Sequence, residues 1–294
     1  MGLFFSSDRF TRPGPGVRPD APRKKGVARL AEIMGRDMWN FFRAGFLAFL
    51  GCLPFIIGMF FAVETHALLF MLLAGIIGGL IAGPELSAMA DTVLRSLRDE
   101  PGYWWETYRR VWKRNARESL VPGMLTGLVV SMQIFTLFHM SVISAGIVTW
   151  VLLILSFVVT LGLESYIWPQ IALLNLPLYG ILKNSLLLFL GYLPRSLGAI
   201  AIKAVYWGAI LLFFPLTTII LPFTNFWLPM LPALLCIYQP LNKCFTIEST
   251  INKMREDELN AALAKDNEPL PEAPTEKAEE STDSSSDDSS SDVQ

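Results

Sequence analysis

The chain has 294 residues, of which 52% are hydrophobic and 17% are charged, and its mean hydropathy is +0.44. Soluble globular domains carry about 25% charged residues, so this composition excludes an ordinary soluble domain and indicates a membrane protein. Charge is divided unevenly. Residues 256–294 hold 13 of the 26 acidic and two of the 24 basic residues, which gives this tail a net charge of −11 and the rest of the chain +9.

The chain begins with a segment that lacks the composition of a folded domain. Residues 1–26 are basic and rich in Pro and Gly, and we expect this arm to be disordered. The next segment, 27–43, has a broad apolar face and predicts a helix that leads into the first membrane span. The membrane domain is therefore expected over 27–254.

Six apolar runs follow, each close to the roughly 20 residues that cross the hydrocarbon of a bilayer. They lie near 44–63, 67–83, 119–138, 142–163, 199–220 and 223–241. The fold class predicted from these runs is all-α, as a polytopic membrane protein with about six transmembrane helices.

Basic residues set the expected orientation of these spans. Lys and Arg are absent from 44–94, 118–182 and 204–242, and each of these gaps fits a helical hairpin. The basic clusters between the gaps then share one side, which the positive-inside rule makes the cytoplasm. The sequence thus predicts a multi-pass membrane protein with both termini cytoplasmic. Lys203, near the start of the fifth span, is expected to snorkel to the cytoplasmic surface.

Amphipathic surface helices are expected on the cytoplasmic side, over 84–98 and 103–118. The first begins at Pro84, and its Glu85 and Asp91 are given no special role. In the second, an aromatic row and a basic row each recur every four residues. The residues of these rows are Trp104, Tyr108, Trp112, Arg109, Lys113 and Arg117. Such a helix is typical of a surface that meets anionic lipid, and an ordinary connector or a partner-docking surface are the alternatives.

Glycines recur at intervals of four in two expected spans. They are Gly75, Gly79 and Gly83 in the second span, and Gly123 and Gly127 in the third. Small residues at this spacing allow helix backbones to approach closely. We expect packing within the chain rather than a dimer interface.

No catalytic, cofactor-binding or metal-binding motif is found. The sequence lacks a phosphate-binding P-loop, a dinucleotide-binding GxGxxG, a zinc-binding HExxH and a GxSxG elbow. His66 and His139 fall on expected outer turns, 73 residues apart. Glu64 and His66 could contact a cation, but two polar residues on one turn are usually just solvated, which is the favoured interpretation. Glu164 lies near the inner end of the fourth span; a functional role at membrane depth and a place at the interface are both open.

The C-terminal segment 255–294 combines acidic residues, prolines and serines, without an apolar stripe after Leu263. Such a segment has little apolar surface to bury. We expect a disordered acidic spacer.

Two blocks of the chain resemble the YesL-like family of bacterial membrane proteins, a family defined by a domain of unknown function. The first block reads Gly83-Pro84-Glu85-Leu86-Ser87-Ala88-Met89, continues from Leu97 to Trp104, and includes Asn115; the second contains Leu182-Lys183-Asn184-Ser185 and Leu193-Pro194-Arg195-Ser196-Leu197. The matching polar and turn residues are Gly83, Pro84, Ser87, Asp99, Pro101, Gly102, Asn115, Asn184, Pro194 and Arg195. The resemblance implies a small polytopic protein, and members are often associated with carbohydrate-uptake systems of the ABC type.

Three functions remain open from the sequence. The first is a non-enzymatic accessory protein of a carbohydrate ABC uptake system, whose partners would be the lipid bilayer and ABC transporter subunits, with no cofactor and no nucleic acid. The second is a transporter or channel, supported by Glu164 and by a faint similarity between 104–120 and 178–197. The third, an enzyme acting on lipid-linked substrates, is weakened by the lack of paired acid–base residues. The oligomeric state is not encoded in any recognisable pattern.

Overall fold

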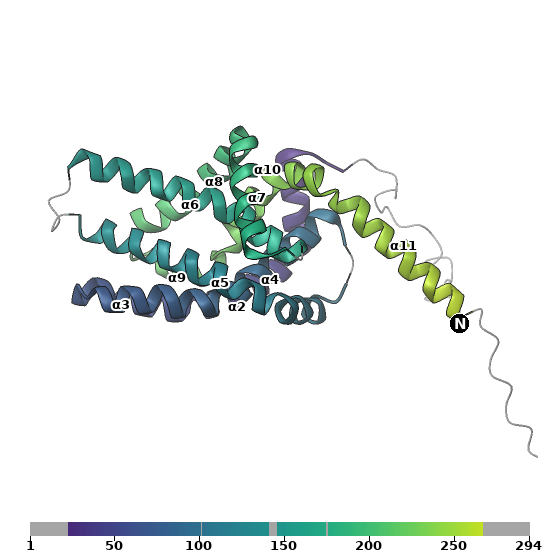
Figure 1. The fold of residues 1–294 in the computed structure, drawn as a ribbon, viewed down its shortest axis with the longest axis horizontal. Helices are drawn as coiled ribbons and strands as arrows, with labels where there is room; N and C mark the ends of the chain where they lie inside the picture. The colour runs from purple at the N-terminus through teal and green to yellow at the C-terminus, as the bar shows by residue number, and fades with distance from the viewer. Residues whose placement is uncertain (1–22, 101, 141–145, 175, 267–294) are drawn as a thin grey trace, which may run out of the picture. The chain divides into compact units, whose positions relative to one another are not determined.

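The computed structural model describes residues 23–100, 102–140, 146–174 and 176–266, and these residues form helices and short turns without any strand (Figure 1). They confirm the all-α fold class. The chain divides into two units, Met1–Glu248 and Ser249–Gln294. The first unit contains every candidate membrane span.

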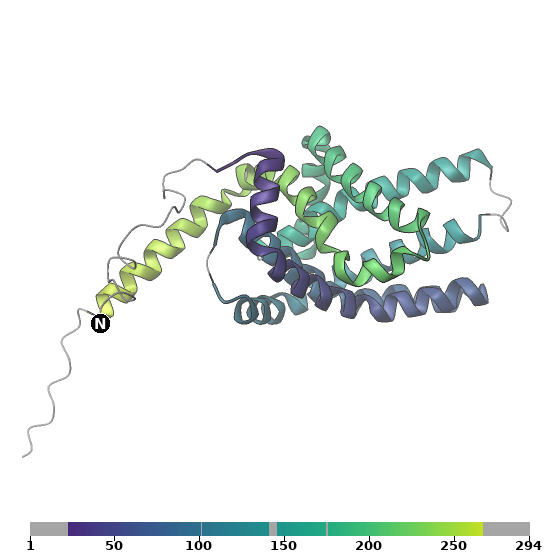
Figure 2. The same cartoon turned by 180° about the vertical axis from the view of Figure 1, so that it is seen from behind.

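The first hairpin is longer than the membrane is thick. Helix α2, Gly26–Thr65, has 40 residues, and its length of about 60 Å is twice the hydrocarbon thickness of a bilayer. The chain returns through α3 (Leu68–Leu73), a π-helical turn η1 (Ala74–Gly78) and α4 (Gly79–Arg98), which follow one another as one 31-residue rod. Residues 27–43 lie in the same helix as the first span, as expected, and the start of α2 runs in a different direction from the rest of the helix (Figure 2).

Helix α5, Trp104–Phe138, packs along η1 and α4 through the spaced glycines. Gly79 lies against the backbone of Gly123, and Gly75 and Gly83 lie against the same helix one turn to either side. A Cβ atom at Gly79 would stand 3.0 Å from the carbonyl carbon of Gly123 and 3.1 Å from Cα of Met124. The expected packing within the chain is confirmed.

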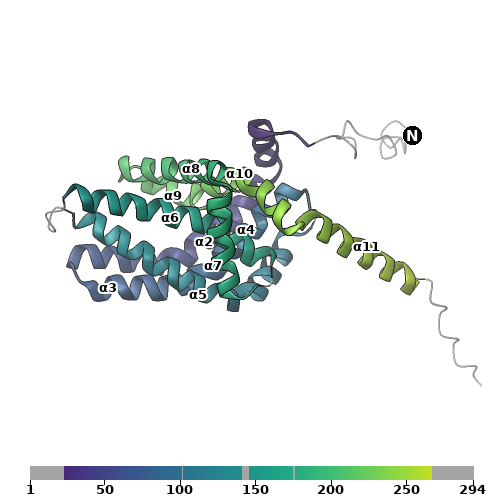
Figure 3. The same ribbon diagram turned by 45° about the horizontal axis from the view of Figure 1, so that its top comes forward.

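Five further helices complete the first unit. They are α6 (Ile147–Leu173), α7 (Leu178–Gly191), α8 (Leu193–Leu212), α9 (Thr217–Thr224) and α10 (Trp227–Phe245). Helix α6 continues through Pro169, and the short α7 then runs across the direction of α6 before α8 begins (Figure 3). Helix α10 packs against α8, and also contacts α2 and α4.

Five helices of the described chain, rather than six, are long and apolar enough to cross a membrane. They are α2, the rod of α3, η1 and α4, and the helices α5, α6 and α8. The sixth expected span, 223–241, falls on the end of α9 and on α10, where prolines and the polar side chains of Gln239 and Asn242 dilute the apolar sequence. About six spans were expected; five helices of the described chain meet the length and apolarity of a span, and the less apolar α10 packs on them and ends near Glu248, which pairs with Arg23 before α2.

The first and last described residues of the first unit lie close together. The guanidinium of Arg23, just before α2, lies 3.1 Å from the carboxylate of Asp99 and 2.7 Å from that of Glu248. Asp99 follows α4 and Glu248 follows α10, so the chain enters and leaves this unit at one end of the bundle (Figure 2). We call this end the polar end.

Away from the polar end, the helices expose apolar side chains as a membrane protein does. Several large hydrophobic residues are more than half exposed. They include Phe60 and Leu69 on the first hairpin, Val151 on α6, Leu187 on α7 and Phe214 after α8. Apolar patches of this extent are unusual on soluble monomers. Together with the five long apolar helices, they identify a multi-pass membrane protein.

The second unit begins in a helix that sequence analysis missed. Helix α11 spans Ile247–Asp266, whereas disorder was expected from residue 255 onward. The segment 256–265 is rich in Glu, Leu, Ala and Lys, all strong helix formers, so intrinsic propensity suffices without an apolar stripe. Most of the expected arm, 1–22, and the remaining tail, 267–294, lie outside the described residues.

Candidate functional site

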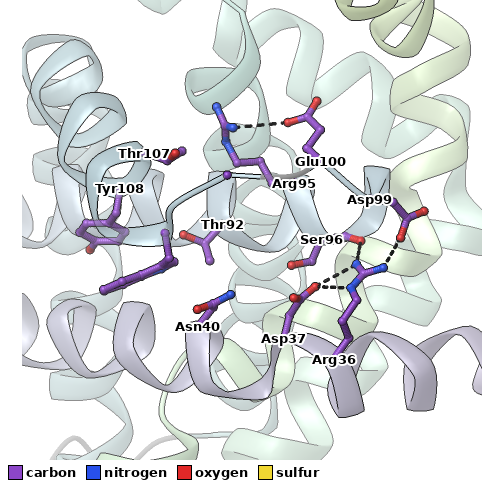
Figure 4. A pocket seen from close by; sticks show the side chains of 12 residues that line it. Arg36, Asp37, Asn40, Thr92, Arg95, Ser96, Asp99, Glu100, Thr107 and Tyr108 are labelled. Atoms are coloured by element: carbon purple, nitrogen blue, oxygen red, sulfur yellow. Dashed lines mark hydrogen bonds and ion pairs between the residues drawn. The ribbon is translucent and has the colours of Figure 1, made fainter. Parts of the chain in front are cut away.

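A polar cavity of about 290 Å³ opens at the polar end, between α2, the end of α4 and the start of α5 (Figure 4). Its lining residues are Arg36, Asp37, Asn40, Thr92, Arg95, Ser96, Asp99, Glu100, Gly102, Trp104, Thr107 and Tyr108. These residues come from α2, from the end of α4 with the turn after it, and from the start of α5. Four residues of the first resemblance block are among the lining residues: Asp99, Glu100, Gly102 and Trp104.

The last turn of α4 is capped by arginines from the preceding chain. The final carbonyl groups of a helix have no partner within it and carry a partial negative charge. Arg36 donates to the carbonyl of Ser96 at 2.8 Å, Arg29 to that of Leu97 at 3.1 Å, and Arg23 to that of Arg98 at 3.1 Å. Three guanidinium groups thus satisfy three successive carbonyls, which fixes α4 against α2.

Asp99 is the centre of this arrangement. It stands at the C-cap of α4 with φ of 60°, a left-handed conformation that Asp tolerates better than most residues. Its carboxylate accepts a hydrogen bond from Arg29 at 2.6 Å and another from Arg36. Burial raises the pKa of this carboxyl, but the hydrogen bonds from Arg36 and Arg29 outweigh burial, so the pKa lies below its ordinary value.

The remaining charges around the cavity are also paired. Arg95 donates to Asp91 at 2.7 Å and lies 3.6 Å from Glu100. Arg98 holds Glu100 with two hydrogen bonds, of 2.8 and 3.0 Å. Asp91 belongs to this network and is only 3% exposed, so its expected place on a surface helix is wrong.

The charges that line the cavity balance one another, because every charged lining residue lies within 3.6 Å of an opposite charge. Trp104 also lines the cavity, and its buried Nε1 atom has no hydrogen-bond partner in the described chain.

Glu85 links α4 to α5 below the cavity. Its carboxylate accepts hydrogen bonds from the Tyr108 hydroxyl at 2.5 Å and from Nε1 of Trp112 at 2.9 Å. Tyr108 is 4% exposed. The view of Glu85 as an idle surface residue is therefore wrong, because its partners come from a helix that folds back onto it.

The segments expected to form separate surface helices belong to α4 and α5, which also contain the second and third spans; 84–98 is largely buried, whereas 103–118 buries only Tyr108, Val111 and Asn115. Tyr108 and Trp112 face α4, which corrects their expected place at the lipid surface, and Trp104 is partly buried. The basic residues Arg109, Lys113 and Arg117 are exposed on the other face of this segment.

The structure separates the two resemblance blocks. In the first, Gly83 packs on Ser119 and Gly123, and Pro84, Ser87 and Asn115 are buried nearby along α4 and α5; Pro101 lies outside the described residues. In the second, Asn184 lies on α7, and Pro194 and Arg195 lie in the first turn of α8. None of these three lines the cavity.

A second polar feature lies among the spans. Glu164 of α6 and Lys203 of α8 line one small pocket together with Met230 of α10. Lys203 is only 7% exposed, so it does not snorkel to the surface as expected. Helix α10 packs on α8, and this packing buries the Lys203 side chain, which was expected to reach the cytoplasmic surface.

No family model, curated protein or solved structure matches the chain.

Proposed function

We propose that the protein is a non-enzymatic, YesL-like membrane protein of the bacterial cell membrane that serves as an accessory to a carbohydrate ABC uptake system. The observation that supports this proposal is that the second part of the first resemblance block, Leu97 to Trp104, lies at the polar end and lines its cavity. Gly83 sets the close approach of α4 and α5, while Asp99 and Gly102 line the cavity.

The construction of the polar end suits a rigid docking surface. Its charges are used to fasten α2, α4 and α5 to one another, as the bonds of Arg29 and Arg36 to Asp99 and the α4 carbonyls show. Beside it, α5 exposes the basic row of Arg109, Lys113 and Arg117. A fixed, basic surface suits the binding of a partner protein better than it suits a transporter, whose substrate site must change conformation.

The proposed orientation places the polar end in the cytoplasm. Its basic residues on α2, α4 and α5 then obey the positive-inside rule, and both ends of the first unit share that side. In this orientation the polar end faces the side on which an ABC system hydrolyses ATP.

Purification from native membranes, with quantitative identification of co-purified proteins, tests this function. ABC permease and ATPase subunits should be enriched over a bait of unrelated sequence. The enrichment should fall with Arg109→Glu and Lys113→Glu together, while Lys183→Glu, an exposed charge reversal on α7, should leave it unchanged. Absence of ABC subunits, combined with unchanged carbohydrate uptake in cells that lack the protein, would contradict the proposal.

A transporter is the second candidate, and the Glu164–Lys203 pocket is the observation that favours it. Ionisable side chains at membrane depth commonly mark a substrate or ion path. This candidate predicts solute uptake by the purified protein in liposomes, with loss of uptake in Glu164→Gln. Liposomes that take up no solute beyond protein-free controls would remove it.

A further inference from the structure

The two histidines of the sequence meet at the end of the bundle opposite the polar end. His66 follows α2, His139 follows α5, and they are the only histidines in the 294 residues. Nδ1 of His66 lies 2.6 Å from Nε2 of His139. Sequence analysis placed them on two separate turns, and the structure brings these turns together, because the first hairpin and α5 end side by side.

The surroundings of His139 fix the direction of its free lone pair. Its Nδ1 lies 2.7 Å from the carbonyl oxygen of Phe135, so Nδ1 carries the proton and donates it. Its ring also stacks on Phe135 at a centroid distance of 4.0 Å and is 5% exposed. Nε2 of a neutral His139 is thereby an oriented acceptor that faces His66.

This is the environment that proteins give to an imidazole that binds a metal. A metal-ligating histidine usually donates its other ring N–H to a carbonyl or carboxylate, which sets the tautomer and the ring orientation. His66 is exposed, on a turn with φ of 54°, and can present Nδ1 to the same point from the solvent side. One ligand is fixed and the other is adjustable.

We propose that His66 and His139 form a binding site for a divalent transition-metal ion, with Zn²⁺ as the probe. Metal–nitrogen distances of about 2.0–2.1 Å in a tetrahedral site place two nitrogens about 3.3 Å apart. The present separation is 2.6 Å, so the exposed His66 ring moves outward by about 0.7 Å and its proton shifts from Nδ1 to Nε2. Neither ring becomes charged, and the ion takes the place of the shared hydrogen bond.

The composition of the site sets its selectivity and strength. Among the described residues, no group of three or more His, Cys, Asp or Glu side chains that could hold a metal is present, so water fills the remaining positions. An imidazole pair favours Zn²⁺, Ni²⁺ and Cu²⁺ over Mg²⁺ and Ca²⁺. We therefore expect an exchangeable site that ties the turn after α2 to the end of α5, independently of the function proposed above.

The test uses the full-length protein in detergent, without a histidine tag and with isotope-labelled histidine. Because the chain has two histidines, the NMR spectrum contains one imidazole spin system from each. Zn²⁺ should shift both together, with saturation at one ion per chain, reversal by a chelator and a rise in melting temperature. Mg²⁺ at the same concentration should shift neither.

Variants separate this site from other ligands in the chain. His66→Gln and His139→Gln should each weaken zinc affinity at least about tenfold, while circular dichroism confirms retained helix. Cys244→Ser removes an exposed thiol and should leave the affinity unchanged. Zinc titrations that leave both imidazoles unshifted, or that give equal affinity in wild type and both histidine variants, would overturn the proposal.

Discussion

A methyl group at Gly79 provides the sharpest test of the packing between α4 and α5. In Gly79→Ala the new Cβ would meet the carbonyl of Gly123 and stand 3.1 Å from Cα of Met124. These are backbone atoms, so no side chain can rotate away and the two helices must separate. Overpacking of this kind costs about 1–3 kcal/mol.

Gly35→Ala is the matched control. Gly35 lies in α2, and no neighbouring atom lies within 4 Å of the position that a Cβ would take there, so the substitution meets only open space. Alanine is favoured over glycine in a helix by up to about 1 kcal/mol. The two changes, chemically identical, should therefore alter stability with opposite signs.

Reversible unfolding in mixed micelles, followed by circular dichroism, measures both free energies of unfolding. Gly79→Ala should lower the free energy by about 1–3 kcal/mol, and Gly35→Ala should leave it unchanged or raise it. Equal stability of Gly79→Ala and wild type would refute the close approach of these helices.

Three further outcomes follow from the contacts described. Asp99→Asn should lower the melting temperature in detergent, because it removes the counter-ion of the buried Arg29. Since the pKa of Asp99 is lowered in the fold, its contribution is present above the ordinary carboxyl pKa of about 3.9 and is lost as pH falls further, so below about pH 4 the melting temperatures of wild type and Asp99→Asn should converge. Tyr108→Phe should cost about 1–2 kcal/mol in unfolding measurements, because Glu85 loses one of two hydrogen bonds. Truncation after Asp266 should leave the melting temperature unchanged, and a clear decrease would show that the acidic tail stabilises the membrane unit.

Features with a regular spacing could be predicted from the sequence. The glycines at intervals of four predicted close helix packing within the chain, because spacing alone places small residues on one helix face; the structure shows that Gly79 meets Gly123. The placement of basic residues also predicted that the ends of the first unit share one side, as the ion pairs of Arg23 now show. The glycine spacing is a local signal, and the distribution of basic residues depends only on how the chain alternates between the two sides of the membrane.

Burial of charge was not predictable in the same way. Asp91 and Glu85 were assigned to a surface because charged side chains are rarely buried unless paired. Their partners are Arg95, one helical turn away, and Tyr108 and Trp112, which lie 23 and 27 residues along the chain. The i,i+4 spacing of Asp91 and Arg95 was available, but it does not distinguish a solvated pair from a buried one.

Contacts between distant turns left no trace in the sequence. His66 and His139 were placed on the same side of the membrane, but nothing across the 73-residue separation indicates that two particular turns touch. Similarly, the burial of the Lys203 side chain depends on how α10 packs on α8. Tertiary packing decides both, and periodicity carries no information on it.

The central claim, that the polar end of a multi-pass membrane protein faces the cytoplasm with both ends of the first unit, can be tested by cysteine accessibility in intact cells. Single cysteines at Lys25, Gly102 and Ser249, in a chain with its own three cysteines replaced by serine, should resist a membrane-impermeant thiol reagent until the cells are permeabilised. Cysteines at Thr65 and Gly146 should react in intact cells. Labelling of Lys25 and Ser249 from opposite sides of the membrane would contradict the account.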